Sequence, residues 1–207
     1  MVLNMFEFSN VNSYYYTEEQ IQKLKSTKIG IAGAGGLGSN CALALVRCGF
    51  EKFIIADFDV VSVSNLNRQQ YVASDIDKPK VECLRRNLLA INPDVICEIY
   101  KERVTVSNAH EIFGSCDCVV EAFDNAESKA MIVNEFLTED KLVVSASGLG
   151  GYGQTDRIIT RKIRNNFYLI GDNISEVGTD CKPYAPCVMI AAAKEADVVL
   201  DWVLGKK

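Results

Sequence analysis

Glycines near the start of the chain have a spacing that suits phosphate binding. The run 33–38 reads GAGGLG, in which Gly33, Gly35 and Gly38 fit the pattern GxGxxG and Gly36 lies between them. Glycine permits a tight turn and a close backbone approach, and the amide groups at the start of the following helix attract an anion. The loop therefore predicts a phosphate-bearing ligand, but by itself it does not say which one.

A carboxylate follows the next apolar run, KFIIAD. Asp57 ends this run about twenty residues beyond the glycines, where an acidic residue accepts hydrogen bonds from ribose hydroxyls. The loop and Asp57 together predict an adenine nucleotide. They leave both NAD and ATP open.

Charged residues farther along the chain favour a triphosphate. The pyrophosphate of NAD carries about two negative charges, whereas ATP carries about four and calls for Lys, Arg and Mg²⁺. Arg68 and Lys80 could supply positive charge, and Asp124 could hold Mg²⁺ at the end of a later strand. Taken singly, Arg68 could form a surface ion pair, Lys80 could lie on a helix face, and Asp124 could cap the next helix. Their joint occurrence favours ATP with Mg²⁺.

Strands and helices alternate around these residues. Short apolar runs separated by amphipathic segments predict an α/β fold: a Rossmann-like, mostly parallel sheet with helices on both faces. Two further strands with no helix between them predict an antiparallel C-terminal pair. Strands are expected at 28–33, 52–57, 95–100, 118–122, 141–146, 154–162 and 166–170, and helices from 17 and at 37–48, 79–91, 127–137 and 187–204.

We expect one domain with three parts: an N-terminal helical extension at 1–27, a nucleotide-binding core at 28–150, and a C-terminal part at 151–207. The C-terminal part would contain the antiparallel strands, a cysteine-bearing loop and the last helix. No composition shift or proline-rich stretch indicates a linker.

Composition excludes several kinds of site. The single histidine, His110, rules out His₂, His₃ and HExxH metal sites within one chain. None of the eight cysteines forms a CxxC pair, so no zinc is expected. The net charge of −5 weighs against a nucleic-acid partner. No signal peptide or membrane span is recognisable, so we expect a cytoplasmic protein with reduced cysteines.

Four segments together resemble a known family. GAGGLGS, DFDVVSVSNLNRQ, DKPKVE and the strand-end pair Asp124-Asn125 are similar to the ThiF/MoeB/HesA family, the bacterial relatives of ubiquitin-activating enzymes. The resemblance covers roughly 21–153 and, more loosely, the last helix. The length and the C-terminal segment PYAPC look most like a short, divergent ThiF branch of thiamine biosynthesis.

The resemblance implies an adenylyltransferase. Such an enzyme binds ATP and Mg²⁺ and adenylates the C-terminal glycine of a small ubiquitin-like sulfur-carrier protein, here a ThiS-like carrier for thiazole synthesis, with release of pyrophosphate. It further implies a homodimer and a possible sulfur-donor enzyme. Catalysis is assigned to Arg68, Lys80, Asp124 and Cys181, with Asp124 as the Mg²⁺ ligand. The implied nucleotide-binding residues are Gly33, Gly35, Gly36, Gly38, Asp57, Asp59, Asn65, Asn67, Arg68, Lys80 and Asn125.

Departures from the family pattern leave other functions open. The zinc-binding cysteines are absent, and the N-terminal arginine that reaches across the dimer in many relatives has only Lys23, Lys25 and Lys28 as possible substitutes. Cys181 could form a covalent link with the activated carrier, and Cys187 is a second choice. The other six cysteines are expected to pack in the core. The alternatives are activation of a molybdopterin carrier or of tRNA threonylcarbamoyladenosine, an NAD-binding oxidoreductase, and a non-catalytic module that only docks a ubiquitin-like partner.

Overall fold

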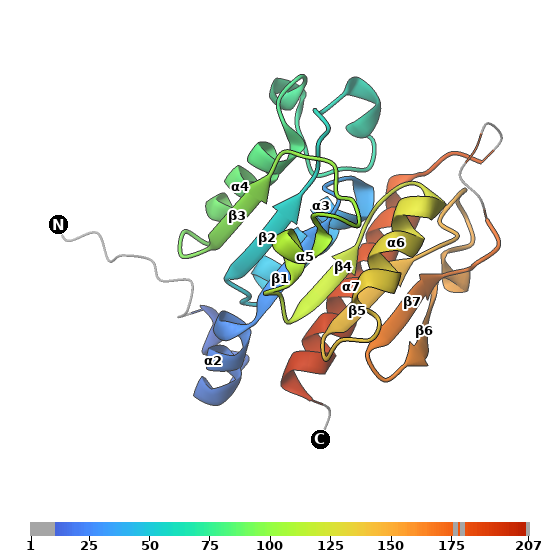
Figure 1. The fold of residues 1–207 in the computed structure, drawn as a ribbon. Coiled ribbons are helices and arrows are strands. Elements are labelled where there is room, and N and C mark those ends of the chain that lie inside the picture. The colour runs from blue at the N-terminus through green and yellow to red at the C-terminus, as the bar shows by residue number, and fades with distance from the viewer. Residues whose placement is uncertain (1–10, 176–177, 179–180, 206–207) are drawn as a thin grey trace.

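The computed structural model describes residues 11–175, 178 and 181–205. Seven strands form one sheet in the order β3-β2-β1-β4-β5-β7-β6 (Figure 1). Every neighbouring pair is parallel except β6 and β7, which confirms a mostly parallel sheet with an antiparallel C-terminal pair. The strands are β1 (Lys28–Ala32), β2 (Lys52–Ala56), β3 (Ile96–Tyr100), β4 (Cys118–Glu121), β5 (Leu142–Ala146), β6 (Ile159–Arg164) and β7 (Phe167–Gly171).

Helices cover both faces of the sheet (Figure 1). One buried apolar cluster joins one face of the sheet to α3, α4 and α7, and a second joins the other face to α5 and α6. The central strands are apolar on both faces because both are covered. The helices are α2 (Glu18–Ser26), α3 (Gly36–Arg47), α4 (Lys80–Ile91), α5 (Ala109–Phe113), α6 (Ala126–Phe136) and α7 (Ala185–Leu204).

Capping residues set several helix starts. Thr17 accepts a hydrogen bond from the backbone amide of Gln20, whose side chain in turn accepts from the amide of Thr17, so the two residues form a capping box before α2. Pro186 lies in the first turn of α7, where its missing N–H costs nothing. Pro79 precedes α4 as its N-cap residue rather than lying inside the helix.

The last third of the chain departs from the predicted boundaries. The strand expected from 154 begins only at Ile159, because Thr155–Arg157 forms a 3-10 turn. β6 lies at the sheet edge, and most of its side chains are exposed, Arg161 and Lys162 being among its charged residues. Charged side chains on an exposed edge strand oppose pairing with other chains. Among the described residues, no helix is long and apolar enough to cross a membrane.

Candidate nucleotide site

The sheet has one switch point, between β1 and β4, where the strand order reverses. In open α/β sheets a ligand binds outside the carboxyl ends of the strands at such a point. The glycine loop follows β1, and Asp124 follows β4 after a short turn. The predicted glycine and carboxylate residues therefore lie at the same edge of the sheet.

Two glycines are required by the geometry of the loop. Gly33 has a φ of +106°, and a Cβ there would lie 2.8 Å from the carbonyl oxygen of Ala122. A Cβ at Gly38 would lie 1.8 Å from the carbonyl oxygen of Gly33. These positions explain the tight turn from β1 into α3.

The first turn of α3 has no side-chain cap. Gly35 is its N-cap residue and has no side chain that could accept a hydrogen bond from the helix start. Amide donors and the positive end of the helix dipole therefore face the carboxyl edge of the sheet, which fits an anionic phosphate.

Asp57 has a structural task that sequence reasoning missed. Its carboxylate accepts a hydrogen bond from the amide of Ala34 at 2.7 Å and another from the amide of Asp59 at 2.8 Å. Burial raises the pKa of Asp57, while Lys80 and these two amides oppose the shift. Asp57 thus ties the glycine loop to the end of β2, and its predicted contact with a ribose stays a prediction.

Lys80 is buried at the start of α4, with only 6% of the residue exposed. Its Nζ lies 2.7 Å from a carboxylate oxygen of Asp59. The Lys80 amide also donates to the Asp59 carbonyl oxygen at 3.0 Å. Asp59 therefore holds the ammonium group of Lys80 in the free protein, a role that the motif alone does not reveal.

The structure brings Arg68 and Asp124 together from distant parts of the chain. Arg68 is half-buried, and one guanidinium nitrogen donates to the Ser64 carbonyl oxygen at 3.0 Å and to the Asn67 side chain at 2.8 Å. Burial lowers the pKa of Arg68, and the nearby Asp124 carboxylate opposes that shift. Arg68 also lies against the start of α3, because a Cβ at Gly36 would be 3.7 Å from its Cγ. The Asp124 carboxylate is exposed at the same edge of the sheet.

Asn125, not Asp124, caps α6. The Asn125 side-chain oxygen accepts a hydrogen bond from the amide of Ser128 at 2.8 Å, so the alternative in which Asp124 is the cap is wrong. The Asp124 carboxylate remains exposed, with a long 3.4 Å contact from the Asn125 amide group. The part of the chain that the structure describes holds no group of three possible metal ligands. One carboxylate suits Mg²⁺, which often binds through one or two carboxylates plus substrate phosphates.

The side chains of Asn65 and Asn67 form hydrogen bonds with backbone groups. Asn65 accepts from the amide of Ser62 at 3.0 Å and closes a short 3-10 turn. Asn67 donates to the Pro183 carbonyl oxygen at 3.3 Å and so links this loop to the segment before α7. The Asn67 side-chain oxygen also accepts from Arg68, so both of its polar atoms have partners within the chain. The nucleotide contacts of Asn65 and Asn67 stay predictions.

The cysteines divide as the sequence predicted, with two exceptions. Cys41, Cys83, Cys116 and Cys118 are buried core residues, whereas Cys48 and Cys97, also expected in the core, are only partly buried.

The two remaining cysteines, Cys181 and Cys187, both lie close to Gly151. Cys187 is buried, and its Sγ lies 3.3 Å from the Gly151 carbonyl oxygen. Burial raises the pKa of Cys187, which disfavours the reactive thiolate. Cys181 is partly exposed, and its Sγ would be 3.5 Å from a Cβ at Gly151. Cys181 therefore remains the better candidate for covalent chemistry.

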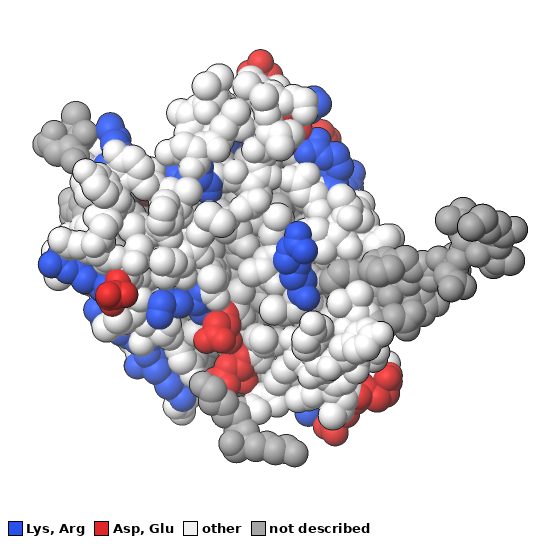
Figure 2. Space-filling model, turned by 180° about the vertical axis from the view of Figure 1, so that it is seen from behind, with Lys and Arg blue, Asp and Glu red and all other residues white. Residues whose placement is uncertain are grey.

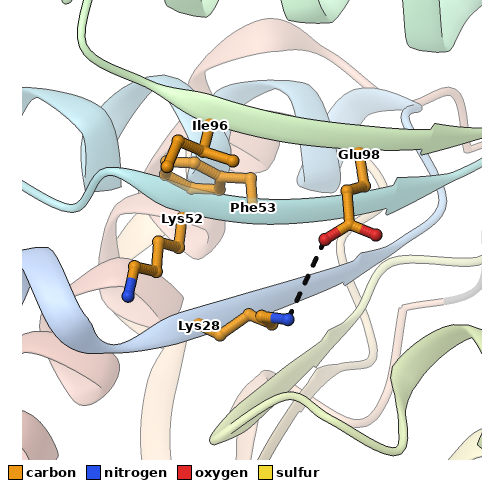
Figure 3. Close-up of a pocket in the computed structure, with 5 residues that line it drawn as sticks. All are labelled: Lys28, Lys52, Phe53, Ile96 and Glu98. Carbon is orange, nitrogen blue, oxygen red and sulfur yellow. Dashed lines mark ion pairs between the residues drawn. The ribbon is translucent and has the colours of Figure 1, made fainter.

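A shallow hollow lies at the opposite end of the strands (Figure 3). Lys28, Lys52 and Ile96 begin β1, β2 and β3 there, and the Nζ of Lys28 lies 3.8 Å from Glu98. This edge of the sheet is the amino edge, so the hollow is not part of the nucleotide site.

The N-terminal lysines that could replace an arginine are paired within their own chain. The Nζ of Lys23 lies 2.9 Å from Glu19, and the Nζ of Lys25 lies 3.1 Å from Glu51. Together with the pair of Lys28 and Glu98, these contacts give each of the three lysines an acidic partner within its own chain.

Comparisons with known proteins agree with this geometry. The model of the ThiF family matches residues 9–207. tRNA threonylcarbamoyladenosine dehydratase 2 of Saccharomyces cerevisiae is 32% identical over 185 residues, which cover 77% of this chain and 40% of that protein. Adenylyltransferase and sulfurtransferase UBA4 of Candida glabrata is 32% identical over 190 residues, which cover 88% and 44%. The chain therefore spans less than half the length of these two curated relatives.

One solved structure resembles the chain over almost its whole length. The tRNA N6-threonylcarbamoyladenosine dehydratase of E. coli, TcdA, solved in complex with ATP, has a TM-score of 0.86 at 19% identity. The superposition covers 94% of this chain and 93% of that one. At this identity the likeness establishes the fold.

Proposed function

The chain belongs to the ThiF family, and from this premise we propose that it uses ATP to activate a carboxylate. An oxygen of the acceptor carboxylate attacks the α-phosphorus of ATP, the bond to the pyrophosphate oxygen breaks, and an acyl-adenylate forms. The reaction needs no protein nucleophile. It needs the reactants held in line and the phosphate charge neutralised.

The position of Arg68 against the uncapped start of α3, with the Asp124 carboxylate at the same edge of the sheet, carries this proposal. Backbone amides of the glycine loop 33–38 would donate hydrogen bonds to phosphate oxygens, and Arg68 would neutralise the phosphate charge. Lys80 would add charge after exchanging its bond with Asp59 for a phosphate. Mg²⁺, when held by Asp124, would neutralise further phosphate charge. An NAD-dependent oxidoreductase would have no use for Asp124 and Arg68 in this arrangement.

We propose tRNA threonylcarbamoyladenosine as the first candidate acceptor. A dehydratase acting on this nucleoside is among the curated relatives, and the fold of another matches nearly end to end. Its threonyl carboxylate is chemically suited to adenylation, after which an internal nucleophile could displace AMP. The thiamine-specific carrier favoured by the motif has no such support among the comparisons.

A ubiquitin-like carrier ending in glycine is the second candidate acceptor, because of charge. The net charge is −5, and on the face seen in Figure 2 Lys and Arg are scattered among uncharged residues without forming a continuous patch. A surface that binds tRNA usually carries clustered cations. The curated relatives also include UBA4 proteins. With either acceptor we propose a homodimer, as the family resemblance implies.

ATP–pyrophosphate exchange with each acceptor tests the proposal. Exchange should depend on one acceptor, either tRNA carrying threonylcarbamoyladenosine or a carrier ending in glycine. Asp124→Asn should reduce it strongly at millimolar Mg²⁺, whereas the control Asp94→Asn, at an exposed turn of the opposite sheet edge, should not. No exchange with either acceptor, or full activity of Asp124→Asn, would overturn the assignment.

A further inference from the structure

A buried carboxylate lies three residues before Asp124 in the chain. Glu121 is the last residue of β4, and none of its surface is exposed. It accepts hydrogen bonds from the Phe123 amide at 2.7 Å, from Ser145 Oγ at 2.5 Å and from Lys129 Nζ at 3.1 and 3.2 Å. Both carboxylate oxygens are therefore fully engaged.

The position of this charge needs an explanation beyond packing. The preceding residues of β4 are buried and mostly apolar, and an apolar residue at position 121 would extend the same core. Taking a carboxylate and an ammonium out of water is costly, and well-packed apolar residues often stabilise a fold as well or better. Burial raises the pKa of Glu121, and Lys129 and Ser145 oppose the shift by stabilising its charged form.

The bonds of Glu121 converge on the turn that carries Asp124. The Phe123 amide belongs to the residue just before Asp124, so this bond sets where the chain leaves β4. Lys129 joins the same carboxylate to the second turn of α6, and Ser145 joins it to the end of β5. One side chain thus fixes the strand, the turn, the following helix and the neighbouring strand around Asp124.

We propose that Glu121 is a positioning residue for Asp124 in the activation of the carboxylate, an inference that rests on the proposed function. It touches neither nucleotide nor acceptor. It holds the turn 122–125 so that the Asp124 carboxylate faces the start of α3 and Arg68, where the phosphates and Mg²⁺ are expected. Without the buried charge network, Asp124 would remain present but would point in many directions.

A double-mutant cycle distinguishes positioning from simple stabilisation. Glu121→Gln retains an acceptor for the Phe123 amide but removes the charge that Lys129 pairs with. Wild type, Glu121→Gln, Asp124→Asn and the double variant are compared in ATP–pyrophosphate exchange over a Mg²⁺ titration. Calorimetric titration of ATP with Mg²⁺ provides a second readout for the same four proteins.

We expect Glu121→Gln to raise the Mg²⁺ concentration for half-maximal exchange about tenfold, and to change the acceptor KM little. In the Asp124→Asn background the same substitution should have almost no further effect, because the group it acts through is gone. Ser145→Ala keeps the charge and removes one bond, so it should shift the Mg²⁺ requirement in the same direction by less. Asp75→Asn removes the charge of another fully buried carboxylate, which pairs with Arg86, so it is the matched control and should leave the Mg²⁺ requirement unchanged.

Equal losses from Glu121→Gln in both backgrounds, or an unchanged Mg²⁺ requirement, would overturn the positioning role. Absence of exchange in the wild type would instead reject the proposed function, and the nucleotide titration would then decide the positioning role alone. If Glu121→Gln does not fold, Ser145→Ala in the two Asp124 backgrounds completes the same cycle.

Discussion

Replacing Glu195 by methionine should stabilise the protein, and increasingly so as the pH rises. Glu195 lies on α7 with no exposed surface, and neither carboxylate oxygen has a hydrogen-bond partner among the described residues. Burial raises the pKa of its carboxyl well above the ordinary 4.5, Glu121 adds to the shift, and Lys129 opposes it. Burial without a hydrogen-bond partner therefore favours the neutral form of this carboxyl group in the folded protein.

The sign of the pH dependence follows from proton counting. Above pH 4.5 the unfolded chain releases the Glu195 proton, while the folded chain keeps it up to the raised pKa. Stability linked to Glu195 is complete below pH 4.5 and falls as the pH rises, with the unfolding equilibrium constant growing up to tenfold per pH unit. An unpaired buried polar group costs about 1–3 kcal/mol in addition. Glu195→Met should therefore gain about 1–3 kcal/mol at pH 5 and more at pH 7.

Urea unfolding of wild type and Glu195→Met from pH 5 to 8 measures this difference. Methionine and glutamate have similar helix propensities and similar length, so the backbone contribution stays small. Asp197→Asn, an exposed change two residues along the same helix, is the control and should show no such trend. A stability difference that stays constant with pH, or a destabilised Glu195→Met, would show that Glu195 is ionised and paired, and would refute this reasoning.

Three other substitutions test separate parts of the structure. Asp75 is buried and receives two bonds from Arg86, at 2.7 and 2.8 Å; Asp75→Asn should lower the free energy of unfolding by about 2 kcal/mol or more in urea titrations at pH 7. Lys80→Met should reduce ATP–pyrophosphate exchange about a hundredfold and leave Asp59 without its partner, whereas unchanged exchange would remove Lys80 from the phosphate site. Cys181→Ser should retain exchange but lose any reducible covalent adduct with a carrier on non-reducing gels; a surviving adduct would assign the covalent role elsewhere.

The sheet could be predicted from sequence because its central strands are short apolar runs bounded by polar residues. β1, β2, β4 and β5 all lie within one or two residues of the predicted bounds, since a strand buried on both faces leaves a continuous signal. β6 was misplaced at its start for the opposite reason. Its residues are mostly exposed at the sheet edge, so neither burial nor alternation marks where Ile159 begins the strand.

The sequence predicts which residues gather at one edge of the sheet but not the bonds that hold them. Gly33, Arg68 and Asp124 follow β1, β2 and β4, and the carboxyl ends of these neighbouring parallel strands lie at one edge. The bond between Lys80 and Asp59 was not predictable, because it depends on how the turn after β2 folds back onto α4. Glu121 carries no motif signal, since a lone glutamate at the end of an apolar run is also typical of a solvated strand end.

β2 and β4, the two strands that flank β1, are each followed by a turn that a carboxylate holds through a backbone hydrogen bond. β2 is followed by the partly buried Asp57, and β4 ends in the buried Glu121. Each carboxylate accepts a bond from the amide two residues later, that of Asp59 or Phe123. Asp57 also accepts from the amide of Ala34 in the glycine loop. Turns at the surface have few apolar contacts to fix them, so their order must come from bonds to backbone donors. The fold thus uses negative charge at the carboxyl edge of the sheet to shape the loops. Lys129 pairs with Glu121, and Lys80 pairs with Asp59 and opposes the raised pKa of Asp57, so both lysines offset that charge before any ligand binds.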